Sequence, residues 1–166
     1  MTFDRKVAGL DDTDWAILDE LQRDGRTPFS ELGRRVSLSA PAVTERVRRL
    51  EQAGVITGYR AVVDPAALGA GIEALVRVRV PHGSTDRFRH HVVGRPEVLH
   101  CDHVTGDDCM VLRVRTTTMG RLEEIVGAVG TFGATTTTLV FSSEVRDRAL
   151  AREVVAPADD LDRATG

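Results

Sequence analysis

The chain has 166 residues, of which 42% are hydrophobic and 28% are charged, and its net charge is -3. This length allows one ordinary domain or two small ones and excludes a large multidomain enzyme. The composition excludes wholesale disorder. The low aromatic content, 4%, disfavours a stacking platform for single-stranded nucleic acid. We therefore expect a folded protein with an aliphatic core.

The N-terminal residues and the cysteines indicate the cellular compartment of the protein. Apolar runs are short and broken by arginine, and Asp4, Arg5 and Lys6 occupy the N-terminus without an apolar signal region. We therefore expect no membrane contact and a cytoplasmic protein. Cys101 and Cys109 are too few for a disulfide scaffold and lack CxxC spacing, so we expect free thiols.

The charge is divided unevenly along the first part of the chain. Residues 1–25 have a net charge of -4, whereas residues 26–63 contain seven arginines and three glutamates, a net charge of +4. A basic stretch inside an acidic protein favours a local contact with a polyanion over general adhesion.

Two short helices are predicted first. Asp11 is placed to cap a helix of apolar residues at helical spacing, and Gly25 ends that helix. Thr27 and Pro28 are predicted to be the cap and the first residue of a second helix, which runs to Val36.

A third helix and a strand complete the first part. The helix is predicted from residue 40 to about residue 53, with Ser39 as its cap. Its buried face is expected to contain Val43, Val47 and Leu50. Residues 55–63 are predicted to form a strand that Asp64 and Pro65 end. Because a small helical module cannot bury this apolar edge, we expect the strand to pair with its copy in a second subunit.

The pattern changes from helical spacing to alternation after residue 71. The elements predicted in chain order are a strand at 72–80, a helix from Ser84 or Thr85 through Val92, strands at 98–104 and 109–116, a helix at 119–129 and a strand at 135–141. The order βαββαβ is the split βαβ, ferredoxin-like arrangement of one antiparallel sheet with both helices on one face.

The expected fold is α+β, with an N-terminal helix-turn-helix domain and a C-terminal ferredoxin-like βαββαβ domain. The predicted boundaries are 1–64 for the first domain with its linking strand and 65–145 for the second. Residues 146–166 are predicted to form a C-terminal part, with a helix over about 144–155 and an acidic tail after it.

The second and third helices have the spacing of a helix-turn-helix, whose second helix enters the major groove of DNA. Arg48 and Arg49 are placed to reach guanine or phosphate, and Thr44 a base edge or methyl group. The predicted DNA-binding residues are Arg34, Arg35, Ser39, Pro41, Ala42, Thr44, Glu45, Arg48 and Arg49. The alternative is that this arginine-rich, amphipathic helix only keeps a solvated face.

Short motifs along the chain resemble those of the Lrp/AsnC, or feast/famine, transcriptional regulators. The resemblance covers residues 10–145. The motifs that carry it are Leu10-Asp11-Asp12-Thr13-Asp14 with Ile17-Leu18, Asp24-Gly25-Arg26, Glu31-Leu32, Arg35-Val36, Leu38-Ser39, Val47-Arg48-Arg49-Leu50-Glu51, Gly54-Val55-Ile56-Thr57-Gly58-Tyr59, Pro96-Glu97-Val98 and Val104-Thr105-Gly106-Asp107.

The resemblance implies that the first domain binds double-stranded DNA as a homodimer. It also implies that the second domain binds a small amino acid and assembles dimers into a larger even-numbered oligomer, an octamer. The effector-binding residues that we predict are Val104, Thr105, Gly106, Asp107, Asp108, Cys109, Thr136 and Thr138. A Gly-Asp turn offers backbone groups and a carboxylate to a zwitterion, although it is also typical of an ordinary hairpin turn.

The chain departs from the family's pattern at three positions. Ser37 stands where the turn favours glycine, and Gly33 where alanine is usual, and both are expected to soften the motif. Cys109 stands where a second acidic residue is frequent, which leaves Asp108 as a neighbouring substitute for ammonium recognition.

Other polar clusters give weaker predictions. Strand alternation places His100 and Asp102 on one face and Cys101 and His103 on the other, so we expect no metal site unless a second subunit completes one. No catalytic nucleophile motif or phosphate loop is present in the sequence, and we expect neither catalysis nor a cofactor.

The sequence therefore predicts a sequence-specific DNA-binding transcriptional regulator that responds to an amino acid by linkage between ligand binding and assembly. Two alternatives stay open. The first is an enzyme on the same two-domain plan that resembles the decarboxylases of tetrapyrrole biosynthesis. The second is an architectural DNA-binding protein without an effector.

Overall fold

The structure, a computed structural model, describes residues 9–106 and 109–155. The chain divides into two compact units, which we treat separately. The first unit runs up to Ala61 and also includes the segment from Val145 onward, and the second unit is Val62–Glu144. In the described ranges, no helix is both long and apolar enough to cross a membrane.

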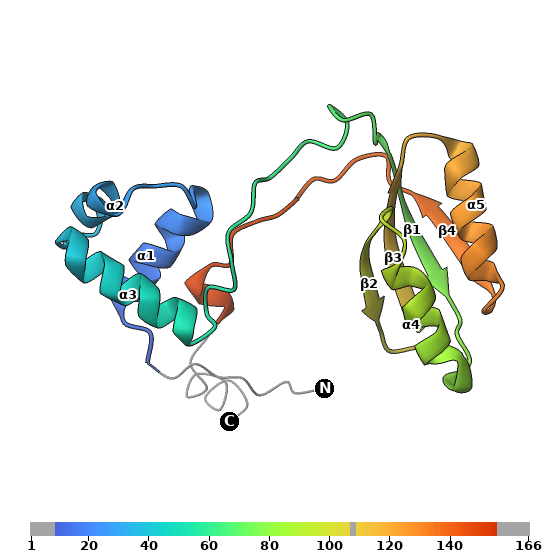
Figure 1. Cartoon of the computed structure of the whole chain (residues 1–166), viewed down its shortest axis with the longest axis horizontal. Helices are drawn as coiled ribbons and strands as arrows, with labels where there is room; N and C mark the ends of the chain where they lie inside the picture. The colour runs from blue at the N-terminus through green and yellow to red at the C-terminus, as the bar shows by residue number, and fades with distance from the viewer. Residues whose placement is uncertain (1–8, 107–108, 156–166) are drawn as a thin grey trace, which may run out of the picture. The chain divides into compact units, whose positions relative to one another are not determined.

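Three helices form the first unit: α1 (Asp12–Arg23), α2 (Phe29–Arg35) and α3 (Ala40–Gln52) (Figure 1). The predicted cap of α1 is confirmed, since the Asp11 carboxylate accepts a hydrogen bond from the backbone N–H of Asp14 at 2.8 Å. Ser39 caps α3 by accepting from the backbone N–H of Ala42. Each helix turns an apolar stripe inward, and the buried cluster contains Ile17, Leu18, Leu21, Leu32, Val43, Val47 and Leu50.

The prediction for the start of α2 is wrong by one residue. The helix begins at Phe29, and Pro28 precedes it with an extended backbone, at ψ 140°. The Pro28 carbonyl accepts the first helical hydrogen bond, from the N–H of Leu32 at 2.9 Å. The Thr27 hydroxyl does not cap α2, because it donates to the Asp24 carbonyl at 2.9 Å.

The turn between α2 and α3 accounts for glycine at position 33 but strains serine at position 37. Ser37 has a positive φ of 56°, a left-handed conformation that glycine adopts more easily. At Gly33, an added Cβ would lie 2.5 Å from the Leu38 carbonyl oxygen. Glycine at this position therefore allows the turn to approach α2 closely.

Two predicted elements near the edges of the first unit are absent from the described chain. The predicted strand at 55–63 is not formed, because the sheet consists of other segments and offers these residues no partner. The predicted helix at 144–155 is also wrong, since only a 3₁₀ turn, Arg152–Val154, is present there. Residues 141–152 of this segment are all exposed and bury no face that would stabilise a helix. The predicted acidic tail lies outside the described residues.

The second unit has the predicted βαββαβ order. Its elements are β1 (Ile72–Val78), a 3₁₀ turn (His82–Ser84), α4 (Thr85–Val93), β2 (Val98–His103), β3 (Met110–Thr116), α5 (Met119–Gly130) and β4 (Thr135–Leu139). The strands pair antiparallel in the order β2-β3-β1-β4, which confirms the ferredoxin-like arrangement. All four predicted strands extend one or two residues beyond the observed ends.

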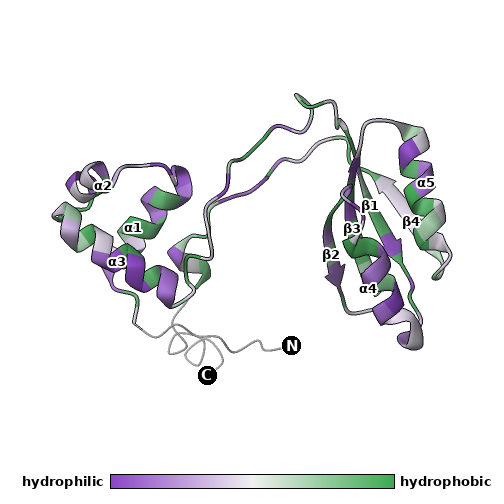
Figure 2. Cartoon of the chain, viewed as in Figure 1, coloured by the Kyte–Doolittle hydropathy of each residue, from purple (hydrophilic) through white to green (hydrophobic). Residues whose placement is uncertain are grey.

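Both helices of the second unit cover the same face of the sheet, which we call the helix face. Alternate residues of β1 and β3 pack there against Phe88 and Val92 of α4 and Leu122, Ile125 and Val129 of α5. The remaining residues of the strands point to the opposite, open face of the sheet. Each of the two helices accordingly carries both hydrophobic and hydrophilic residues, as Figure 2 shows.

Candidate nucleic-acid interface and effector site

The helix α3 presents one polar stripe and one buried stripe. Val43, Val47 and Leu50 are at most 1% exposed, which fixes the rotation of the helix. Most of the residues predicted to contact DNA lie on its accessible side, where Ser39, Pro41, Thr44, Glu45, Arg48 and Arg49 are exposed and Ala42 is half-buried. The structure therefore brings the predicted residues of this helix together on one surface.

The candidate base-reading residue Arg48 is held by its neighbour on the same helix. Its Nε donates to Glu45 Oε2 at 3.2 Å and its Nη2 to Glu45 Oε1 at 3.0 Å. This hydrogen-bonded pair lowers the pKa of the Glu45 carboxyl and raises the pKa of Arg48. Glu45 thus occupies the Nε–Nη2 edge of the Arg48 guanidinium in this structure.

Arg49 is exposed and pairs with a buried carboxylate of α1. Asp14 of α1 is 1% exposed and accepts from Arg49 Nη2 at 2.8 Å and from Arg46 Nη1 at 2.8 Å. Arg46 also donates to Asp11, and this bond is the main cause of the lowered pKa of Asp11. The cluster fixes α3 on α1, a role that the sequence-based prediction missed.

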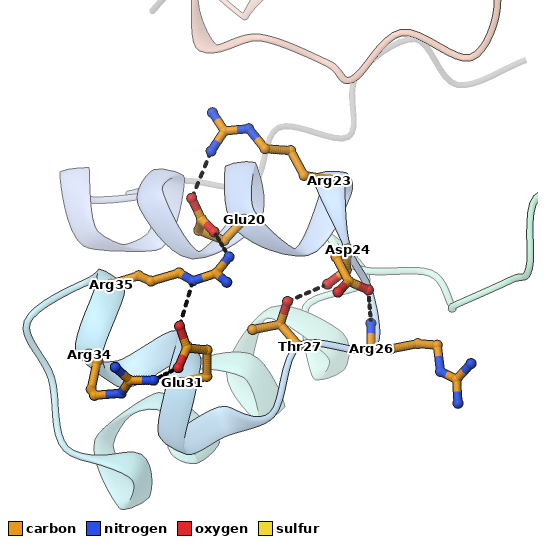
Figure 3. A network of polar contacts seen from close by, with 8 residues as sticks. All are labelled: Glu20, Arg23, Asp24, Arg26, Thr27, Glu31, Arg34 and Arg35. Atoms are coloured by element: carbon orange, nitrogen blue, oxygen red, sulfur yellow. Dashed lines mark hydrogen bonds and ion pairs between the residues drawn. The ribbon is translucent and has the colours of Figure 1, made fainter.

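On α2, the phosphate candidates Arg34 and Arg35 share one carboxylate, that of Glu31. Arg35 also donates to Glu20 of α1 at 2.6 Å, and Glu20 accepts from Arg23 at 2.7 Å. Figure 3 shows the resulting chain of alternating charges, which runs from Arg23 to Arg34. The hydrogen bond from Arg35 is the first cause of the lowered pKa of Glu20.

Every arginine in the predicted DNA-binding set therefore has a carboxylate partner inside the first unit. The opposite charges of residues 1–25 and 26–63 were the signal that could have indicated these pairs, because Asp11, Asp14 and Glu20 come from the acidic part. Arg26 differs from this set, since the described residues offer its guanidinium no ion pair and it points away from the network in Figure 3.

The predicted effector turn joins β2 to β3. Val104, Thr105 and Gly106 are exposed, and the Val104 N–H donates to the Cys109 carbonyl at 2.9 Å. Gly106 has a φ of 106°, a conformation that residues with a side chain rarely adopt. Asp107 and Asp108 lie outside the described residues.

The other predicted effector residues do not meet in a single chain. The Cys109 thiol packs against the end of β1, with Sγ 3.3 Å from the Val80 carbonyl oxygen, and it belongs to the helix face. Thr136 and Thr138 stand opposite Arg77 and Leu75 on the open face of the sheet. Cys109 and these two threonines therefore lie on opposite faces of the sheet within one subunit.

A cavity of about 750 Å³ lies at the other end of the sheet. Its lining includes Leu68, Glu97, Leu99, Arg121 and Glu124. The Glu97 carboxylate accepts from Arg121 Nε at 2.7 Å, and its own backbone N–H together with Arg121 lowers its pKa. The cavity borders the last residues of β3, whereas the predicted effector turn precedes the first, so the two sites are distinct.

The predicted alternation of β2 is confirmed. His100 and Asp102 pair with residues of the open face, and Cys101 and His103 with Leu112 and Met110 of the helix face. Both cysteines are free, and burial raises the pKa of the Cys101 thiol. Over the described ranges, no three metal-binding side chains gather.

A helix-turn-helix unit followed by a ferredoxin-like unit is the plan of a class of transcriptional regulators with separate DNA-binding and ligand-binding parts. The sequence matches the AsnC-type helix-turn-helix domain over residues 10–51 and the Lrp/AsnC ligand binding domain over residues 73–150. The chain belongs to the Lrp/AsnC family and is a DNA-binding transcriptional regulator with a small-molecule effector domain.

Known relatives share most of the chain. It is 33% identical over 133 residues to the HTH-type transcriptional regulator LrpC of Bacillus subtilis (strain 168), covering 80% of this chain and 92% of LrpC. The LrpC structure superposes with a TM-score of 0.79 at 32% identity over 82% of this chain and 98% of that one.

Two further relatives extend the comparison. The regulator Rv2324 of Mycobacterium tuberculosis (strain ATCC 25618 / H37Rv) is 46% identical over 116 residues, covering 69% of this chain and 78% of Rv2324. The complex of the Neisseria meningitidis regulator NMB0573 with L-Met has a TM-score of 0.83 at 28% identity, over 89% of this chain and 100% of that one.

Proposed function

We propose that the protein binds specific duplex DNA through the exposed face of α3 and that an amino acid at the turn between β2 and β3 changes this binding. The exposure pattern of α3 carries the proposal. Its buried stripe leaves Thr44, Glu45 and Arg48 on the accessible side, where a recognition helix meets base edges. Arg34, Arg35 and Arg49 contribute phosphate contacts in this proposal.

The effector is an amino acid. The exposed Thr105–Gly106 backbone, with the following acidic residues of the sequence, offers partners to both the ammonium and the carboxylate of a zwitterion. The L-Met complex of the Neisseria relative supports this class of ligand. Because Cys109 and the threonines of β4 lie on different faces of one sheet, we propose that a neighbouring subunit completes the pocket.

The assembly is an even-numbered homo-oligomer, an octamer in the family's arrangement. Tyr59, Val62 and Val63 are exposed although they are apolar, and their backbone finds no strand partner in the described part of the chain. Pairing of residues 55–63 with the same segment of a second copy would cover these side chains and give the backbone groups hydrogen-bond partners. Ligand binding then favours one arrangement of subunits and thereby one spacing of recognition helices.

We place the protein in the cytoplasm, with duplex DNA as its macromolecular partner, and assign it no catalytic reaction. The two alternatives predict different observations. A tetrapyrrole decarboxylase would form a coloured complex with its substrate. An architectural protein would bind duplexes without an amino-acid response.

The test starts from selection of duplexes by the full chain from a random pool. We expect the selected sequence to bind about 10³-fold or more tightly than a scrambled one at the same salt concentration. Thermal-shift screening of the common amino acids should find at least one that raises the melting temperature, and that amino acid should change operator affinity. Equal affinity for all duplexes, or no amino-acid response, would contradict the proposal.

A further inference from the structure

The carboxylate of Glu31 forms ion pairs with both arginines of α2. Arg34 pairs with it across three residues and Arg35 across four, with Arg35 Nε donating to Glu31 Oε1 at 3.1 Å. All three residues belong to the same helix, and Figure 3 shows the Glu31 carboxylate between the two guanidinium groups. The arginines remain accessible, with side chains 75% and 47% exposed.

An arginine that already pairs with a carboxylate contributes less binding free energy to a phosphate contact than an unpaired arginine does. Sequence-independent affinity for DNA comes from cations that replace counterions condensed on the duplex. If a carboxylate stays beside the arginine, the net charge brought to the phosphates is smaller by one. If it is displaced, its ion pair is lost. Both cases lower the affinity that the two arginines add.

Arg26 differs from Arg34 and Arg35 because no carboxylate of the described residues pairs with its guanidinium. The Asp24 carboxylate accepts a hydrogen bond from the backbone N–H of Arg26 at 2.9 Å, so this contact does not involve the guanidinium. The guanidinium extends away from the network in Figure 3, and its side chain makes no ion pair within the described ranges. Arg26 thus offers a full charge where Arg34 and Arg35 offer a shared one.

We propose that Glu31 limits the sequence-independent affinity of the protein for DNA by offsetting one of the two positive charges of Arg34 and Arg35. This inference rests on the proposed DNA-binding function. We assign this role to Glu31 and not to Glu20, because Glu20 also joins α1 to α2 through its ion pair with Arg35. Removing the charge of Glu31 leaves that connection in place.

The experiment compares wild type with Glu31→Gln in the full chain. Affinities for the selected operator and for a scrambled duplex are measured between 50 and 200 mM salt. Glu31→Gln should bind both duplexes more tightly, with a logarithmic salt slope steeper by about one. A slope difference of one unit makes this advantage shrink about fourfold over that salt range. The ratio of the two affinities should stay constant.

The matched control is Glu123→Gln on α5 in the second unit. Glu123 is exposed, and across the described residues it makes no ion pair, so the substitution changes the net charge equally at another place. It should leave the salt slope unchanged. An equal increase in Glu123→Gln would overturn the inference, because general net charge would then explain the effect.

A second pair of variants keeps the test independent of the stability of Glu31→Gln. Arg34→Gln should reduce the salt slope by clearly less than one, because Glu31 already offsets part of the Arg34 charge. The double variant Glu31→Gln, Arg34→Gln should return to the wild-type slope, which a merely structural role of Glu31 would not produce. Circular dichroism melts verify that each variant is folded.

Unchanged or weaker DNA binding by folded Glu31→Gln, at an unchanged slope, would overturn this inference alone. Absence of duplex binding by the wild type would overturn the proposed function as well. Loss of a full unit of slope in Arg34→Gln would also contradict the role of Glu31.

Discussion

Each unit of the molecule buries one carboxylate between two arginines, but the two clusters do different things. In the first unit, Asp14 is 1% exposed and joins α1 to α3 through Arg46 and Arg49. In the second unit, Glu73 is 4% exposed and pairs with Arg113 and Arg115 of the neighbouring strand β3. The first cluster fixes α3 against α1, and the second lies on the open face of a sheet.

The units also differ in how complete their sites are. The exposed face of α3 is assembled from one continuous helix and is fully formed in a single chain. The predicted effector residues come from a turn and from an edge strand on separate faces, and a single chain leaves them apart. Each proposed recognition surface is therefore built within one subunit, whereas we propose that the effector pocket needs a second subunit.

The largest expected effect is loss of effector binding in Gly106→Ala. The φ of 106° disfavours alanine by about 1–2 kcal/mol, and the turn's backbone groups must shift away from the ligand. Asp107→Ala should act similarly by removing a carboxylate. Calorimetric titration of the best amino acid should show no binding for either variant, while operator binding without ligand persists.

Two results would contradict this separation of the units. Unchanged calorimetric affinity in both variants would place the effector elsewhere, and the cavity beside Glu97 and Arg121 is then the next site to test. Loss of operator binding in the absence of ligand would show that the two units do not act independently.

The second expected effect concerns the two buried carboxylates. Asp14→Ala should destabilise the first unit by about 2 kcal/mol, because it removes charged hydrogen bonds to two arginines. Glu73→Ala should destabilise the second unit by a similar amount, about 2 kcal/mol. Hydrogen exchange measured residue by residue assigns each loss to one unit, and a loss spread equally over both units would refute the comparison.

The third expected effect separates two kinds of DNA contact. Arg48→Ala should weaken operator binding by about 1–3 kcal/mol and relax the preference at one base position. Arg35→Ala should weaken all duplexes alike through lost phosphate contact. Competition with single-base operator variants distinguishes them, and equal affinity of wild type and both variants for the operator would remove these residues from the interface.

The sequence predicts best the features that depend on neighbours along the chain. Asp11 and Ser39 cap their helices as expected because a cap bonds a backbone N–H only three residues away. The alternation of β1 also survives in the structure, since its buried apolar residues Ala74, Val76 and Val78 share the helix face. Such local rules hold without knowledge of the rest of the fold.

The sequence predicts less well the features that need a distant partner. Residues 55–63 have the composition of a strand, but no other strand of the described chain pairs with them. The bonds of Arg46 and Arg49 to Asp14 span more than 30 residues and follow from the packing of α3 on α1. Residues 144–155 bury no apolar face, so an apparent helical pattern there has nothing to stabilise it.

The fourth expected effect is a gain in stability. Ser37 occupies a left-handed conformation at φ 56°, so Ser37→Gly removes backbone strain and should stabilise the first unit by about 0.5–1 kcal/mol after the entropy cost of glycine. Chemical denaturation followed by Trp15, a residue of that unit, measures the change. Ser37→Ala is the control and should bring no gain.

The smallest expected effect is a pH dependence of the stability of the first unit. Hydrogen bonds from arginine lower the pKa values of Asp11, Glu20 and Glu45. A carboxyl whose pKa is lower in the folded state stabilises that state fully above its unfolded pKa and loses this contribution as the pH falls through the folded pKa. The first unit should therefore lose stability as the pH falls from about 5 towards 3, slightly because these groups are exposed. Glu20→Gln should flatten the dependence of the melting temperature on pH in this window, and a profile identical to wild type would show that the Glu20 pair with Arg35 adds nothing to stability.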